Sequence, residues 1–352
     1  MTRRQFGAAA AASLGDMRAA GGIVTERMFG PETKTGPYKH PACMSELASG
    51  DLYMVYYGGA GEYAVETGVF GSRKKKGEAN WSAPQRIASN PFWPVGNGVV
   101  WQAPDGIVWL FFVTRFGETW SDSRIAAKIS RDGAHTWSDT SLLTFELGSM
   151  VRGRPIVLDG GGYLLPIYHE SGHDPEMVGA ESASSFLRYD VKTKRWKETG
   201  RIRSKKGNIQ PAPVSLGNNH LIAYCRRGGG YGPTTDGWLV RAESRDGGWT
   251  WSEGVDSKFP NPNAAVDFLK LANGHLMLVY NDSMSERTPL TVAISTDHDK
   301  SYPHRRNIAE GPHDYAYPIA FQASDGKIHV VYTSDKRQVI RHAVFDESAI
   351  VR

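Results

Sequence analysis

The chain lacks three features that mark common classes of protein. Its formal net charge is only +4 over 352 residues, which suggests neither a nucleic-acid nor a membrane partner. No apolar stretch approaches the roughly 20 residues that a membrane helix needs. Long segments with helical apolar spacing are also missing, apart from an alanine-rich run near the start. The chain has instead 39 glycines, 10 tryptophans and 15 tyrosines, a composition that suits many short strands joined by tight turns.

One short pattern recurs along the chain: a turn residue, usually glycine, is followed two positions later by a branched apolar residue and then by an aromatic-rich strand. The turn residues stand at positions 50, 106, 162, 219, 274 and 326, so the copies lie 52 to 57 residues apart. A fixed period of about 50 residues marks a radial or stacked array. We therefore predict an all-β, six-bladed β-propeller of four-stranded antiparallel blades, in one domain over residues 23–352.

A second turn pattern keeps step with the first. Residues 244–251 match S-x-D-x-G-x-T-W, the motif called an Asp-box, and residues 130–137 match except for Ala134. In this turn the Asp and Ser side chains bond the backbone, glycine supplies an unusual dihedral angle, and the closing aromatic ring packs between blades. We expect it to support the fold and to have no catalytic role. The closing aromatic residues are Trp81, Trp137, Trp196, Trp251 and Tyr302.

Six strand patterns but only five aromatic closures indicate how the ring shuts. We expect residues 23–29 to supply one strand of the sixth blade, beside the C-terminal strand 339–345, which leaves no open sheet edge. Cys43 and Cys225, the only cysteines, then lie in the first and fourth units, on opposite sides of the ring. Because a disulfide needs its Cα atoms within about 7 Å, both are predicted to be free, buried thiols.

The N-terminus points to export. Residues 2–7, TRRQFG, and the apolar run up to Leu14 resemble a twin-arginine signal, so residues 1–22 are predicted to be an export signal of a periplasmic or secreted protein. The apolar run is short and Asp16 follows it closely. The alternative is therefore a disordered N-terminus on a cytoplasmic protein.

Strand alternation sorts the loops of such a propeller onto two faces. The loops that enter each first strand share one face with the loops between strands two and three, and the Asp-boxes lie on the other. Side chains beside the prolines of the first set are expected to project into the axial funnel. That first set contains Lys39, His40, Trp93, Arg154, Gln210, Tyr315 and Tyr317, and the second set contains Glu62, Glu66, His169, Arg226 and Arg287.

The types of these residues favour a pocket for a small acidic molecule. Arginine forks bind a carboxylate through two hydrogen bonds and stay charged at any working pH. Carboxylate and tyrosine groups at the same mouth can transfer protons and supply a nucleophile. We predict no cofactor and no metal site, because His169 and His173 lie in a predicted loop with Gly172 between them. Oligomeric state is not predicted.

From about residue 35 to 345 the chain resembles the sialidase superfamily, specifically the bacterial sialidase-like proteins built of Asp-box (BNR) repeats. The resemblance implies a sialidase-like propeller with three arginines around the sugar carboxylate, a tyrosine nucleophile backed by a glutamate, and an aspartate as acid/base in a first-blade loop. The similar segments are residues 58–62, 209–212, 260–263, 287–290 and 315–318.

Transferred position by position, the resemblance implies that Arg226 and Arg287 are the second and third arginines, with Arg154 as a further candidate. Tyr315 takes the place of the nucleophile, with Tyr317 as a close rival. Glu62 or Glu66 stands in the acid/base loop. His169 and Trp93 are further candidates for contacting the substrate.

Two positions depart from the family pattern. Lys39 and His40 stand where the first arginine belongs, and lysine is a point charge without a fork. Gln210 stands where the glutamate behind the tyrosine belongs, and a neutral amide cannot take the tyrosine proton. A tyrosine with a pKa near 10 then needs another base, for which His40 and His169 are the candidates.

Three functions follow from these residues. The first is an exo-acting glycoside hydrolase of sialidase type that acts on a terminal acidic sugar of a glycan. The second is a lyase that cleaves a uronate-containing glycan by β-elimination, with His40 or a tyrosine as the base. The third is a non-catalytic, glycan-binding propeller.

Overall fold

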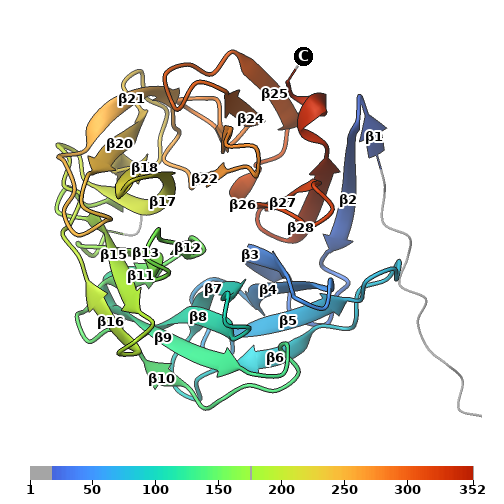
Figure 1. Ribbon diagram of the computed structural model, residues 1–352. Helices are drawn as coiled ribbons and strands as arrows, with labels where there is room; N and C mark the ends of the chain where they lie inside the picture. The colour runs from blue at the N-terminus through green and yellow to red at the C-terminus, as the bar shows by residue number, and fades with distance from the viewer. Residues whose placement is uncertain (1–17, 175–176, 352) are drawn as a thin grey trace, which may run out of the picture.

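The computed structural model describes residues 18–174 and 177–351. Over these residues the chain forms a ring of six antiparallel sheets around a central axis (Figure 1). The predicted all-β, six-bladed propeller is therefore confirmed. The predicted export signal lies mostly outside the described residues. No helix in the described ranges is long and apolar enough to cross a membrane.

The blades follow one another along the chain, and most have four strands. Blade 1 consists of β3 (Tyr38–Glu46), β4 (Leu52–Gly59), β5 (Gly68–Lys74) and β6 (Gln85–Ala88). Blade 2 consists of β7 (Val95–Gln102), β8 (Val108–Arg115), β9 (Ser123–Ser130) and β10 (Ser141–Leu142), with the 3-10 turn η1 (Trp120–Asp122) before β9. Blade 3 consists of β11 (Ser149–Val151), β12 (Ile156–Val157), β13 (Tyr163–His169), β15 (Ala183–Asp190) and β16 (Arg195–Glu198).

Blade 4 consists of β17 (Asn208–Gly217), β18 (His220–Arg227), β20 (Trp238–Ser244) and β21 (Val255–Pro260). Blade 5 consists of β22 (Asp267–Lys270), β23 (Leu276–Asn281), β24 (Leu290–Ser295) and β25 (His304–Ala309). Blade 6 consists of β26 (Ala316–Gln322), β27 (Ile328–Ser334), β28 (Val339–Phe345), β2 (Ile23–Phe29) and β1 (Arg18–Ala20). The 3-10 turn η2 (Glu347–Ala349) follows β28, and β14 (Met177–Val178) pairs with β19 (Gly229–Gly230).

The two ends of the chain close the ring as predicted. Strand β2 pairs antiparallel with β28, with Ile23 opposite Phe345 and Thr25 opposite Ala343. Ile23 is only 5% exposed and packs in one apolar cluster with Phe345 and Leu271 of blade 5. Because β2 covers the outer side of β28, that strand does not present a free edge to other chains.

Each closing aromatic ring packs against the preceding blade, which explains why the pattern repeats. Trp251 of blade 4 stacks on Phe186 of blade 3, with ring centroids 4.4 Å apart. Trp196 of blade 3 meets Phe111 of blade 2 edge-on at 5.7 Å. The same relation joins Trp137 to Tyr53, Trp81 to Phe29 and Tyr302 to Phe259. These rings bury large apolar areas at the blade interfaces.

The Asp-boxes hold their turns by the predicted bonds. Thr250 Oγ1 donates to Asp246 Oδ2 over 2.6 Å, and Ser244 Oγ accepts from the Gly248 backbone N–H over 2.9 Å. Ala134, the one departure in the other box, has φ 65°, the left-handed conformation that glycine adopts at lower cost. The two cysteines are free and buried, as predicted.

Candidate active site

The innermost strands of four blades each carry a β-bulge near the axis. Their register with the next strand shifts between residues 39 and 42, 96 and 99, 209 and 212, and 316 and 319. At three bulges a non-glycine residue is left-handed: Asn97 (φ 50°), Gln210 (φ 56°) and Tyr317 (φ 56°). A bulge re-aims its side chain, and these three line one cavity together with His40 of the fourth bulge.

The cavity has a volume of about 470 Å³, which suits a single small molecule. It opens on the face formed by the loops that enter the first strands, because His40, Gln210 and Tyr317 lie near the starts of β3, β17 and β26. Its charged and phenolic wall residues are Glu62, Glu170, Asp174, Asp314, Arg226, Arg287, Arg337, Tyr57, Tyr63, Tyr168, Tyr231 and Tyr317.

Positive charge surrounds the phenol of Tyr317. Its oxygen accepts a hydrogen bond from Arg226 Nη1 over 2.9 Å and lies 3.4 Å from the amide nitrogen of Gln210. Burial alone would raise the pKa of this phenol, but the charges of Arg226, Arg287 and Arg337 outweigh burial and lower it. The three arginine charges therefore make the Tyr317 phenol more acidic without a neighbouring carboxylate base.

Arg152 fixes the backbone at the same place. Its guanidinium donates to the carbonyl oxygens of Tyr317 and Pro318, and it lies 5.2 Å from the Tyr317 ring centre. Arg152 is only 3% exposed. It therefore supports the bulge through the backbone and does not line the cavity.

Arg287 and Arg226 carry charge that no described salt bridge neutralises. Arg226 donates to the side chains of Asn263, Gln210 and Tyr317, and Arg287 donates to the Asn263 carbonyl. Burial, and then the nearby charge of Arg226, lower the pKa of Arg287 to about 10. A bound anion would offset both effects.

Glu62 lines the cavity as predicted, but its oxygens are already engaged. Oε2 accepts from Tyr38 over 2.9 Å and from Arg337, and Oε1 accepts from Trp120 Nε1 over 3.0 Å. The carboxylate thus ties the first-blade loop to blade 6 and blade 2. Its companion Glu66 does not line the cavity, and its Oε1 accepts from the backbone N–H of Ala60.

Glu170 is the carboxyl group with the strongest case for proton transfer. It lies just beyond β13, in the loop that follows the second strand of blade 3, and it lines the cavity. Burial raises its pKa to about 7; Arg226 opposes the rise and Glu62 adds to it. A carboxyl group with this pKa is partly protonated at neutral pH, which suits an acid that must also act as a base.

The structure places Tyr317, and not Tyr315, in the cavity. Tyr315 is only 6% exposed, donates through its hydroxyl to the Glu310 carbonyl over 3.0 Å, and packs near Tyr332. The two tyrosines are two residues apart, but the bulge in β26 lies between Ala316 and Ile319. It turns Tyr317 toward the axis and leaves Tyr315 in the apolar core.

Lys39 and Arg154 also lie away from the cavity. Lys39 is fully buried, and its Nζ donates to the Gly36 carbonyl over 2.5 Å. Arg154 lines a different cavity, together with Asp267, and its guanidinium donates to the Ala320 carbonyl. Neither takes the place of the first arginine. The third guanidinium of the site belongs to Arg337, a residue that the family resemblance did not imply.

Trp93 lies outside the cavity too, at the rim of blade 2. It is 38% exposed, and its ring lies 6.1 Å from that of Phe116. Its loop leads into β7, so it remains on the same face of the propeller as the cavity.

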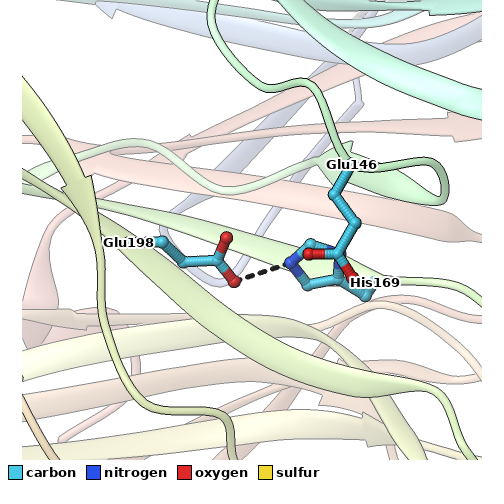
Figure 2. Close-up of side chains that lie close together, drawn as sticks. All are labelled: Glu146, His169 and Glu198. Atoms are coloured by element: carbon cyan, nitrogen blue, oxygen red, sulfur yellow. Dashed lines mark hydrogen bonds and ion pairs between the residues drawn. The ribbon is translucent and has the colours of Figure 1, made fainter.

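His169 forms a cluster with Glu146 and Glu198 (Figure 2), and it does not line the cavity. Its Nε2 is 2.7 Å from Glu198 Oε1, and its Nδ1 is 3.6 Å from Glu146 Oε1. These three residues could hold a metal ion by their spacing. However, Arg201 Nη2 already lies 2.6 Å and 2.7 Å from the two oxygens of Glu146, so a guanidinium supplies the positive charge there.

This cluster helps to place Glu170. The loop that carries Glu146 continues to Gly148, whose carbonyl accepts the backbone N–H of Glu170 over 2.9 Å. His169, the residue before Glu170, is held by Glu198. The two neighbours on the chain therefore point to different sides, one into the ion-pair cluster and one into the cavity.

His40 is the histidine that lines the cavity. It is 1% exposed, its Nδ1 lies 2.7 Å from Thr333 Oγ1, and its Nε2 has no hydrogen-bond partner. Burial, reinforced by the charges of Arg337 and Arg287, lowers its pKa well below the usual value. His40 is therefore neutral at physiological pH. Its ring meets that of Tyr317 edge-on, with centroids 4.2 Å apart.

A family model described as a BNR repeat-like domain matches residues 50–330. The chain therefore belongs to the BNR repeat-like domain family, and the sialidase-like resemblance read from the sequence is confirmed. No curated protein matches the sequence.

Solved structures show the same fold at low identity. The Hadza microbial sialidase Hz136 matches with a TM-score of 0.78 and 15% identity, over 93% of this chain and 69% of that one. An intramolecular trans-sialidase from Ruminococcus gnavus matches with a TM-score of 0.74 and 12% identity, over 92% and 97%. The α-L-arabinofuranosidase Arb93A from Fusarium graminearum matches with a TM-score of 0.67 and 14% identity, over 93% and 99%.

Proposed function

We propose that this protein is a retaining glycoside hydrolase that removes a terminal acidic sugar from a glycan, with Tyr317 as the nucleophile. The observation that carries the proposal is the environment of the Tyr317 phenol. Its oxygen accepts from Arg226, and three arginine charges lower its pKa. A tyrosine prepared in this way can attack without the glutamate that Gln210 replaces.

The same arginines support an acidic substrate. A carboxylate bound beside Arg226 and Arg287 would gain charge-assisted hydrogen bonds and would relieve the repulsion between the two guanidinium groups. That binding would place the anomeric carbon of the sugar near the Tyr317 oxygen. Of the three similar structures reported above, one is named as a sialidase and one as an intramolecular trans-sialidase, which is consistent with an acidic sugar.

Glu170 completes the reaction as the proton donor. In the first step Tyr317, reacting as the phenolate, forms a bond from its oxygen to the anomeric carbon, the glycosidic bond breaks, and Glu170 gives its proton to the leaving oxygen. In the second step water attacks the anomeric carbon, Glu170 takes a proton from it, and Tyr317 leaves. Two inversions at one carbon retain its configuration.

Paired variants test the proposal. With fluorogenic sialosides and uronides as substrates, Tyr317→Phe should lower kcat by roughly a thousandfold, the scale of removing a catalytic group. Tyr315→Phe, which removes a hydroxyl that bonds the Glu310 carbonyl outside the cavity, should keep kcat within about twofold. Intact-mass measurement after rapid quenching should find a sugar adduct on the wild type and none on Tyr317→Phe. Equal activities of the wild type and Tyr317→Phe would contradict the proposal.

A second candidate, β-elimination on a uronate-containing glycan, is favoured by His40. His40 lines the cavity and its Nε2 has no hydrogen-bond partner, so this nitrogen is the group available to remove a carbon-bound proton. Elimination gives an unsaturated product that absorbs ultraviolet light, whereas hydrolysis does not, so one absorbance assay separates the two. Binding of the sugars without turnover, unchanged by Tyr317→Phe, would instead leave the non-catalytic, glycan-binding function.

A further inference from the structure

Exposed aromatic side chains gather on the loops of blade 2, on the same face as the cavity. Phe92 is 75% exposed and Phe145 is 79% exposed, unusual values for large apolar side chains. Phe92 and Trp93 precede β7, Phe116 follows β8, and Phe145 precedes β11. All three loops open on the cavity face, because they either enter a first strand or join strands two and three. We call Phe92, Trp93, Phe116 and Phe145 the aromatic rim.

Specific contacts join the three loops that carry the aromatic rim. The rings of Trp93 and Phe116 lie 6.1 Å apart. The Arg124 guanidinium lies 5.3 Å from the centre of the Phe116 ring and donates through Nε to the Phe145 carbonyl over 2.9 Å. The Arg115 backbone N–H donates to the Pro94 carbonyl over 3.1 Å, which joins the first two loops.

The rim continues directly into the cavity wall. Trp120, in the same loop as Phe116, lines the cavity together with Tyr63, and their rings lie 5.7 Å apart. Arg115, next to Phe116 in the chain, lies 4.3 Å from the Tyr63 ring centre and 5.8 Å from that of Trp120. Rings and guanidinium groups therefore alternate from the cavity mouth out to Phe145.

We propose that the aromatic rim binds the sugar units that follow the terminal sugar of a glycan, so that oligosaccharides bind better than simple glycosides. This inference rests on the proposed function, because a terminal sugar in the cavity anchors the chain. A sugar ring has an apolar C–H face that packs on an aromatic ring, while its hydroxyl and carboxylate groups bond arginine. Exposed aromatic side chains gathered on neighbouring loops mark an interaction site. Its alternation with arginine and its continuity with the cavity favour a glycan chain over a protein partner.

Substrate length provides the test. The double variant Phe92→Ser/Trp93→Ala should raise KM about tenfold for a sialyl trisaccharide and for a glucuronate-ended tetrasaccharide. It should leave kcat/KM within about twofold for the aryl glycosides of the same sugars. Trp249→Ala is the matched control, because Trp249 is similarly exposed at 39% but lies in an Asp-box turn on the opposite face. It should change neither value.

A binding measurement separates this inference from the proposed function. If no substrate turns over, the affinity of wild type and variant for the same oligosaccharides is measured by calorimetry. A tenfold weaker Kd for the double variant then supports the rim although hydrolysis fails. The inference would be overturned if the double variant lost activity equally on short and long sugars. It would also be overturned if wild type and variant bound the oligosaccharides with equal affinity, or if neither bound them. A change in oligomeric mass in place of glycan affinity would overturn it as well, because the surface would then be a protein interface.

Discussion

A buried pair of histidines next to the ring closure should make this protein lose stability in mild acid. His329 Nδ1 lies 2.9 Å from His342 Nε2, and His342 Nδ1 lies 2.8 Å from Glu26 Oε1 on β2. One proton between the two rings makes a hydrogen bond, whereas two protons would face each other. Burial, and then the charge of His342, lower the pKa of His329 to about 3.

The sign follows from proton binding in the two states. In the folded protein His329 stays neutral down to a pH of about 3, whereas in the unfolded chain it takes up a proton below a pH of about 6.5. The unfolded state therefore binds more protons between these values, and stability falls as the pH is lowered from 6.5. At pH 5, about 1.5 units below the unfolded pKa, His329 alone should lower the free energy of unfolding by about 2 kcal/mol.

Urea unfolding at pH 7.5 and pH 5 checks this value. His329→Gln keeps an N–H donor toward His342 but cannot titrate. Between pH 7.5 and pH 5 its free energy of unfolding should therefore fall by about 2 kcal/mol less than that of the wild type. Other acid-sensitive groups such as His40 are present in both proteins and cancel. His135 is exposed, so the control variant His135→Gln should lose as much stability between the two pH values as the wild type. Equal losses in the wild type and His329→Gln would refute the neutral, buried state of His329.

Two further predictions concern the site and the ring closure. Glu170→Gln should lower kcat by roughly a hundredfold or more and abolish the fall in activity as the pH rises through about 7, because the wild-type acid loses its proton there. An unchanged pH profile would assign this fall in activity to another group. Glu181 is exposed, so Glu181→Gln serves as the control. Ile23→Ala should destabilise the fold by about 2–4 kcal/mol in urea, since it opens a cavity where β2 packs on blade 5, whereas Val24→Ala, 41% exposed, should have little effect. Equal effects of these two β2 variants would argue against the closure.

Most of the propeller could be predicted because its determinants are local and repeated. The Asp-box bonds run within eight residues, and each closing ring needs only the preceding blade, so a pattern such as residues 244–251 carries its own structural meaning. The closure of the ring by residues 23–29 could also be predicted, because six strand patterns with only five closing aromatic residues leave one blade that needs a strand from elsewhere in the chain.

The candidate site could be predicted only in part. Arg226, Arg287, Gln210 and Glu62 were chosen from loops whose face is fixed by strand alternation, and all of them line the cavity. The choice of Arg154 depended on a detail that sequence does not contain. Arg154 follows the same kind of loop but belongs to another cavity.

The sequence by itself determined the repeat, the blade number, the closing strand and the face on which the chemistry lies, because period, turn residues and alternation are properties of short segments. Only the tertiary structure decided which tyrosine meets the arginines and which carboxyl group is protonated near neutral pH. The direction of Tyr317 depends on a register shift against β27, and the pKa of Glu170 depends on burial and on charges from separate blades. These contributions to the pKa and to side-chain direction arise only after the fold has brought distant segments to one axis.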